Sequence, residues 1–216
     1  MKNLNQNIRT AEEPLENWWE NGDQKYPCII GSELMNDHAP IPDTDNLEQF
    51  WTEADSVIER TMMLIDNTHY FGQAVPFHYV DFGSSAMPCA LGARPEYVDK
   101  ETIWAHPQFD SIDQVLSTEL RQDNPFYRNI LKTTELSVSL AHNHHMVAPV
   151  ALGGVGDNLA GLYGTENLLT DMVLRPEKVE IAMGRQKQIW IEAFEQIQSI
   201  IKKSGNLGGI GWAGIW

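Results

Sequence analysis

The chain has 216 residues, with 15 Lys or Arg against 30 Asp or Glu, so its formal net charge is −15. This acidity argues against nucleic acid and anionic membrane surfaces as partners, because phosphate binding requires clustered Lys and Arg. No apolar run approaches the ~20 residues that span a bilayer, and the polar N-terminus lacks the apolar centre of a signal peptide. We therefore expect a cytoplasmic protein with neither nucleic acid nor membrane as a partner.

The first part of the chain alternates helical and extended patterns. Residues 11–20 are typical of a short helix, and residues 26–34 of an extended segment. Apolar residues at spacings of three, four and seven predict a long helix over 45–67. Asp45 is its expected N-cap and Glu48 the capping-box partner, since these residue types satisfy the free N–H groups of a first turn.

The middle of the chain contains a predicted strand over 74–80, followed by a short helix or turn over 84–92. Residues 93–110 are predicted to be irregular, with short extended pieces. A second long helix is expected to start at Asn124-Pro125, because proline is well placed in a first turn, where its missing N–H costs nothing.

The last part opens with a continuous apolar run over 146–152, which is typical of a strand buried on both faces. A helical stretch is expected from Leu159. The strongest helical period begins at Pro176 and ends before Gly205, a plausible C-cap residue. Residues 208–216 predict another apolar extended segment.

Buried strands that alternate with amphipathic helices indicate a parallel sheet and an α/β fold. The sheet could be an open doubly wound sheet or a barrel, and the periodicity does not choose between them. A parallel strand is normally covered by a following helix. We therefore expect either that the chain is part of a longer protein or that its last strand is an edge.

Several segments, in this order, resemble the uroporphyrinogen decarboxylase superfamily, which includes porphyrin-pathway decarboxylases and methyltransferases that act with corrinoid proteins. The segments are ENWWENG, FHYVDFGSSAMPCALG, ETIW, APVALGGVGDNLAGLYG, NLLTDMVLRPEKVEIAM and GGIGWAGIW. The first three of them resemble an uncharacterised branch of the superfamily.

The resemblance implies a (β/α)8 TIM barrel, of which this chain supplies the N-terminal cap and about the first half. Residues 1–70 would form a helical cap, and residues 71–216 the first part of the barrel. The Arg-rich loop with which the decarboxylases bind substrate carboxylates has no match, since Arg9 is the only arginine before Arg60. The resemblance therefore favours a methyltransferase-like branch.

Two alternatives stay open: a decarboxylase of uroporphyrinogen or a related polycarboxylate, and a non-catalytic fragment or binding module. The expected partners are a small-molecule substrate and a corrinoid protein, and a homodimer is also open. Zinc and a corrinoid would belong to the full-length protein, because the family binds zinc through later barrel residues. We expect no cofactor in this chain, and its cysteines, Cys28 and Cys89, stand alone outside any zinc motif.

Asp81 is the candidate catalytic residue, because it ends a predicted strand and barrel active sites lie at the carboxyl ends of strands. The resemblance implies that this aspartate stabilises a protonated pyrrole intermediate. The alternative is an ordinary turn or cap aspartate that serves the following short helix.

A glycine-rich turn between a strand and a helix is the candidate substrate-binding segment, since glycines let the backbone approach a ligand. Within it, Asp157 and Asn158 could contact a ligand or cap the helix. The resemblance adds Tyr163, which could equally be a packing residue. The candidate substrate-binding residues are Gly154, Gly156, Asp157, Asn158 and Tyr163.

Three histidines, His142, His144 and His145, follow a predicted helix and suggest a metal site. They precede a strand, however, which places them at the amino ends of the barrel strands, where residues serve stability. We therefore assign them a structural role and predict no metal ligands in the chain. His78, within the first strand, could face either the barrel interior or the helices.

Overall fold

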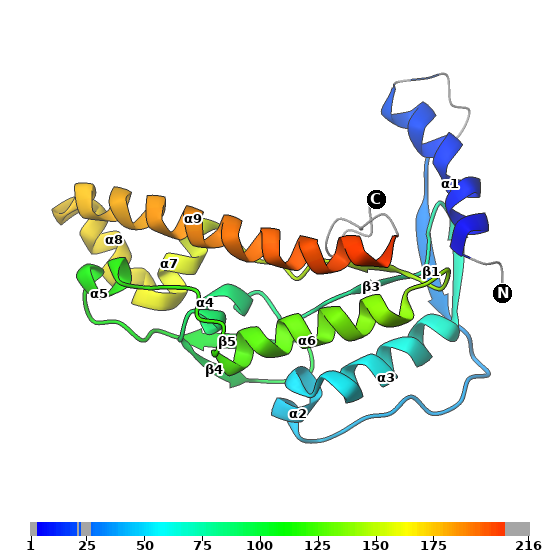
Figure 1. Ribbon diagram of the computed structural model, residues 1–216, viewed down its shortest axis with the longest axis horizontal. Coiled ribbons are helices and arrows are strands. Elements are labelled where there is room, and N and C mark those ends of the chain that lie inside the picture. Colours follow the sequence, from blue (N-terminus) through cyan, green and yellow to red (C-terminus); the bar gives the residue numbers. More distant parts are fainter. Residues whose placement is uncertain (1–3, 21, 23–26, 206–216) are drawn as a thin grey trace.

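A computed structural model describes residues 4–20, 22 and 27–205 of the chain. The structure is mixed α/β, as expected, and combines helices with three two-stranded sheets (Figure 1). The strands of the described residues form no closed barrel. Within the same residues, no helix is both long and apolar enough to cross a membrane. The predicted extended segment over 208–216 lies outside the described residues.

The centre of the molecule is a pair of parallel strands, β3 (Phe77–Tyr79) and β6 (Met146–Ala148). These are shorter than the predicted strands, because pairing covers only three residues of each apolar run. His78 pairs with Val147, and their neighbours on each strand face the opposite way. Every residue of β6 is buried, in agreement with its continuous apolar sequence.

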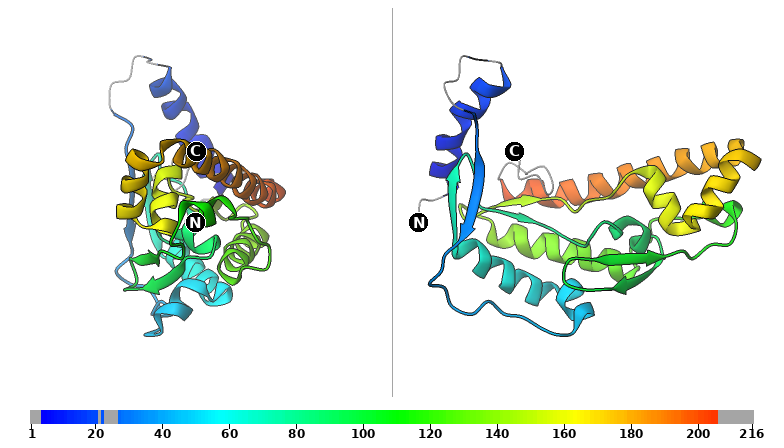
Figure 2. Two further views of the ribbon diagram at one scale, coloured as in Figure 1. Left: turned by 90° about the vertical axis from the view of Figure 1, so that its left-hand side faces the viewer. Right: turned by 180° about the vertical axis from the view of Figure 1, so that it is seen from behind.

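Three long helices lie on one side of this strand pair, as the view from behind shows (Figure 2). They are α3 (Ala54–Asp66), α6 (Pro125–Leu140) and α9 (Pro176–Ile201). The apolar stripes of α6 and α9 join the strands in the main hydrophobic core, in which Ile130 and Ile197 are fully buried, and α3 packs against α6. Burial of these stripes is the chief source of helix stability, because tertiary packing of an apolar face contributes more than intrinsic helix propensity.

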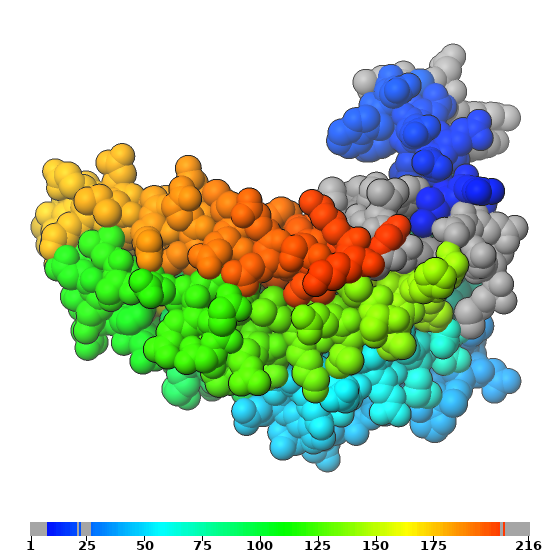
Figure 3. Space-filling view, viewed as in Figure 1, coloured from blue at the N-terminus to red at the C-terminus, as the bar shows by residue number. Residues whose placement is uncertain are grey.

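One end of the elongated molecule carries the antiparallel strands β1 (Ile30–Leu34) and β2 (Thr68–Gly72), together with α1 (Leu4–Trp19). Helix α1 projects from the body in the space-filling view (Figure 3). Its Ala11 packs with Met146, and so anchors α1 against the strand pair. The expected domain boundary after residue 70 falls within β2.

The opposite end is built from short elements around the β4–β5 hairpin (Figure 1). These elements are α4 (Ala86–Ala90), β4 (Arg94–Tyr97), β5 (Ile103–His106), α5 (Ile112–Leu116), α7 (Val155–Tyr163) and α8 (Thr165–Leu174). Helix α7 contacts α4, α5, α8 and β5 there, and α8 leads into the long α9.

The predicted helix over 45–67 is two helices, α2 (Leu47–Thr52) and α3, separated by Glu53. Glu53 has φ −79° and ψ 96°, an extended conformation that ends one helix and starts the next. Asp45 is not the N-cap. The Asn46 side chain accepts a hydrogen bond from the Gln49 N–H at 3.0 Å instead.

Several predicted helix ends are confirmed. Asn124 caps α6, with proline in the first turn, and α9 begins at Pro176. Gly205 adopts the left-handed conformation, with φ 69°, after the last turn. Helix α7, however, starts at Val155, because the glycine-rich segment itself enters the helix.

Candidate functional site

The two predicted site segments lie together at the carboxyl edge of the strand pair. Because β3 and β6 are parallel, the segments that follow them leave at the same edge. The Val80 N–H donates to the Ala148 carbonyl at 3.2 Å, which continues the pairing toward this edge. A Cβ atom placed on Gly153 would lie 3.9 Å from the Ser84 carbonyl oxygen, so the two loops touch.

Asp81 stands in the first of these loops with its side chain exposed. Its Oδ1 accepts a hydrogen bond from the Gly83 N–H at 2.8 Å, and Gly83 has a φ of 69°. The residue before helix α4 is Ser85, so Asp81 shapes the turn and does not cap that helix. Although the residue is exposed, the loops around it remove part of the hydration of its carboxylate, which raises the pKa of Asp81, and the Gly83 hydrogen bond opposes this rise.

The glycine-rich segment is divided between anchoring and exposed residues. Asn158 is 1% exposed, and its Nδ2 donates to the Leu152 carbonyl at 2.9 Å, so it ties the helix to the loop. Asp157 is exposed beside the N-cap Gly154 in the first turn of α7. A Cβ atom on Gly156 would meet no atom within 4 Å, so this position faces open space.

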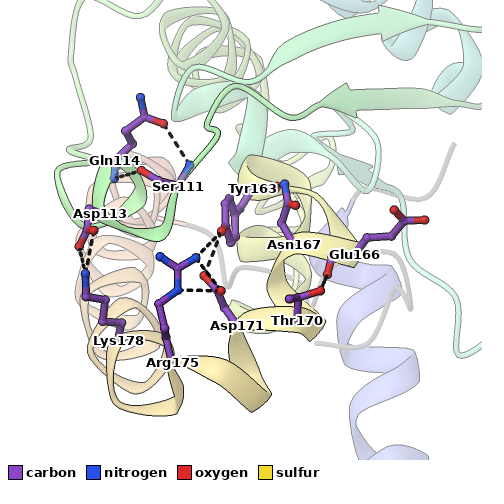
Figure 4. A network of polar contacts seen from close by, with 10 residues as sticks. All are labelled: Ser111, Asp113, Gln114, Tyr163, Glu166, Asn167, Thr170, Asp171, Arg175 and Lys178. Atoms are coloured by element: carbon purple, nitrogen blue, oxygen red, sulfur yellow. Dashed lines mark hydrogen bonds and ion pairs between the residues drawn. The ribbon is translucent and has the colours of Figure 1, made fainter.

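Tyr163 lies at the other end of α7 and belongs to a separate polar network (Figure 4). It is 3% exposed, and its hydroxyl donates to Asp171 Oδ2 at 2.9 Å. The Arg175 Nε donates to Asp171 Oδ1 at 2.8 Å and completes the pairing of this buried carboxylate. Burial and the Asp171 hydrogen bond raise the pKa of Tyr163. The structure therefore separates Tyr163 from the other candidate residues.

A second polar cluster lies near the amino edge of the strand pair, where the histidines were predicted to lie. Two of its histidines are buried and hydrogen-bonded. His145 and His78 are buried, and both hydrogen-bond the Ser137 hydroxyl of α6, at 3.1 Å and 2.8 Å. His144 connects His145 to Asp66 at the end of α3. His142 stays exposed. His78 therefore faces the helices, in a chain of contacts that the sequence did not reveal.

Burial explains the electrostatics of this second cluster. It lowers the pKa of His78 to about 4 and that of His145 to about 3, because the charged imidazolium loses its hydration. Both rings are therefore neutral near pH 7. Since the residues that form the cluster come from α3, β3, α6 and the segment before β6, only the tertiary structure brings them together.

Neither cluster forms a metal centre. Among the residues that the structure describes, His, Cys, Asp and Glu side chains form no group of three that could hold a metal ion.

Comparison with known proteins gives no relative: no family model, no curated protein and no solved structure matches the chain.

Proposed function

We propose that the chain is the N-terminal cap and first part of a uroporphyrinogen decarboxylase-type (β/α)8 barrel, in a branch similar to corrinoid-dependent methyltransferases. One observation supports this proposal above the others. Asp81 and the Gly154–Asn158 segment, which carry the resemblance, follow two parallel strands and meet at one carboxyl edge. Substrates of barrel enzymes bind at this edge.

The exposed residues at this edge define the proposed contact surface. Asp81 offers a carboxylate whose Oδ1 is held by the turn, and Asp157 offers a second acidic group. Gly156 leaves room for a ligand close to the backbone. Such a surface suits a substrate that carries or develops positive charge, which Asp81 would stabilise. Asn158 would hold the loop in place without contacting the substrate.

The decarboxylase alternative rests on the same aspartate, since the resemblance assigns it to a protonated pyrrole. The absence of an Arg-rich N-terminal loop favours the methyltransferase branch. Each alternative predicts its own large macrocyclic ligand: a corrinoid for the methyltransferase branch and a tetrapyrrole for the decarboxylase. A binding test with one probe of each kind therefore separates them.

The test measures binding of hydroxocobalamin and of uroporphyrin III to the full chain by quenching of tryptophan fluorescence. Asp81→Asn keeps the turn acceptor but removes the charge, and we expect it to weaken binding about tenfold, the loss of one charge-assisted contact. Asp99→Asn is the matched control, because Asp99 Oδ1 accepts from the Glu101 N–H at 2.8 Å in the same kind of turn. Preference for hydroxocobalamin would support the methyltransferase branch, and preference for uroporphyrin III the decarboxylase alternative. Failure of both probes to bind, or equal effects of the two substitutions, would contradict the proposal.

A further inference from the structure

We propose a second binding site, separate from the carboxyl edge, in a cavity near the amino edge of the strand pair that takes a small organic cation with Asp66 as its counter-ion. The cavity has a volume of about 630 Å³. Its wall comes from the end of α3, from β2, from the turn before β6 and from Thr10 of α1. This volume lies within the range of small-molecule sites, ~300–1,000 Å³.

The charges of the residues that line the cavity indicate the charge of the ligand. Among the described residues that line the cavity there is no Lys or Arg, and Asp66 is the one carboxylate. The Asp66 side chain is 47% exposed, so it is accessible to a ligand. The net charge of the chain, −15, adds to the negative potential. A cation is therefore attracted to this cavity, and an anion is repelled.

A chain of hydrogen bonds behind the cavity holds Asp66 in place as an acceptor. His144 Nε2 lies 2.9 Å from Asp66 Oδ1, and the Nδ1 atoms of His144 and His145 are 2.8 Å apart. Two facing ring nitrogens share a single proton.

The contacts continue beyond His145. Ser137 Oγ lies 3.1 Å from His145 Nε2 and 2.8 Å from His78 Nδ1. These buried contacts hold His144, and through it the Asp66 carboxylate, in place, while the Asp66 side chain remains partly exposed to a ligand.

Aromatic side chains at the cavity indicate that the ligand also has an apolar body. The His69 and Phe71 rings are stacked, with centroids 6.2 Å apart and planes 26° apart. Gly31 pairs with Phe71 across the strands, and a Cβ atom there would lie 2.1 Å from the ring, so the ring occupies the space that glycine leaves. Tyr70 stands between His69 and Phe71 in β2, so its side chain lies on the other face of the strand, and burial raises the pKa of its phenol to about 12, which keeps it neutral. Aromatic faces attract organic cations, so the His69–Phe71 pair suits an ammonium group on an apolar body.

The test uses benzylamine, with benzyl alcohol and benzoate as neutral and anionic probes of the same body. Binding to the full chain is measured by NMR titration at a pH near 7.5, where benzylamine is protonated, following the ring signals of His69 and Tyr70. We expect benzylamine to bind at least tenfold more tightly than either analogue, because only it can pair with Asp66. Equal binding of the three probes, or no binding of benzylamine, would overturn the proposal.

Two variants and a control make the site assignment specific. Asp66→Asn should weaken benzylamine binding about tenfold and leave benzyl alcohol unchanged. Asp55→Asn on the same helix makes the same change in net charge at an exposed pair with Lys132, and should have no effect. Phe71→Leu replaces a side chain that is 46% exposed, so the fold should persist while benzylamine binding falls severalfold. Equal effects of the Asp66 and Asp55 substitutions would show that the cation is not held in this cavity.

Discussion

His78 and His145 are 4% and 0% exposed, and each is stabilised by a hydrogen bond to Ser137. Burial of an imidazole favours its neutral form, which is why the pKa values are lowered to about 4 and about 3. The same side chains titrate near 6.5 when the chain is unfolded. Protonation of these two residues is therefore linked to unfolding.

The protein should lose stability as the pH falls from about 6.5 to about 4. In this window the unfolded chain binds protons at both positions and the folded chain does not, so the free energy of unfolding falls by up to about 1.4 kcal/mol per pH unit for each histidine. Above the window both states are neutral and the dependence ends. Urea denaturation at a series of pH values measures this slope.

Two variants separate this effect from the titration of surface groups. His78→Asn, which can still hydrogen-bond Ser137, should make the slope shallower, while His142→Asn at an exposed position should leave it unchanged. Identical slopes in all three proteins would mean that His78 does not control the acid sensitivity.

At the scale of elements, close approach between α7 and α4 depends on one glycine. A Cβ atom on Gly161 would lie 2.6 Å from Pro88 Cγ, so α7 packs directly against the Pro88 ring of α4. Gly184, in the middle of α9, has no neighbour within 4 Å of the same atom. Gly161 and Gly184 therefore have different reasons for their presence, and of these two only Gly161 is required by packing.

Alanine substitution should have opposite effects at these two positions. Gly184→Ala should stabilise the protein by up to about 1 kcal/mol, because alanine has the higher helix propensity and meets no obstacle. Gly161→Ala should destabilise it, since overpacking costs about 1–3 kcal/mol and exceeds that gain. Chemical denaturation of the two variants measures both. A stabilised Gly161→Ala protein would show that α4 and α7 can move apart at little cost.

At the scale of the whole molecule, negative charge opposes the compact state. The chain carries 30 acidic against 15 basic side chains, and the ion pairs of the described residues lie mostly at the surface. Exposed pairs contribute about 0–1 kcal/mol each, so they do not offset the repulsion of a net charge of −15.

Salt should therefore stabilise the protein at neutral pH. Raising NaCl from about 0.05 M to about 0.5 M shortens the Debye length to a few ångströms and screens the repulsion, so the urea midpoint should rise. Near the isoelectric point, which is about 4.7, the repulsion vanishes and the same addition should have a much smaller effect. A midpoint that falls with salt at neutral pH would mean that the ion pairs outweigh the net charge.

The sequence by itself determined the features that depend on neighbouring residues. The caps at Asn124 and Gly205 and the start of α9 follow from side chains within one turn, and the apolar run that forms β6 reflects burial on both faces. The meeting of Asp81 with the glycine-rich segment was also predictable, because parallel strands bring their following loops to one edge.

The tertiary structure alone decided which residues become partners across the chain. Strand β2 was missed because its pattern gains meaning only when it pairs with β1, and Asn158 and Tyr163 proved to be buried, with hydrogen-bond partners at Leu152 and Asp171. The chain from Asp66 to His78 joins four separate segments, and no local spacing encodes it. Hydrogen bonds and burial between distant segments depend on how the elements pack, and so they appear only in the folded molecule.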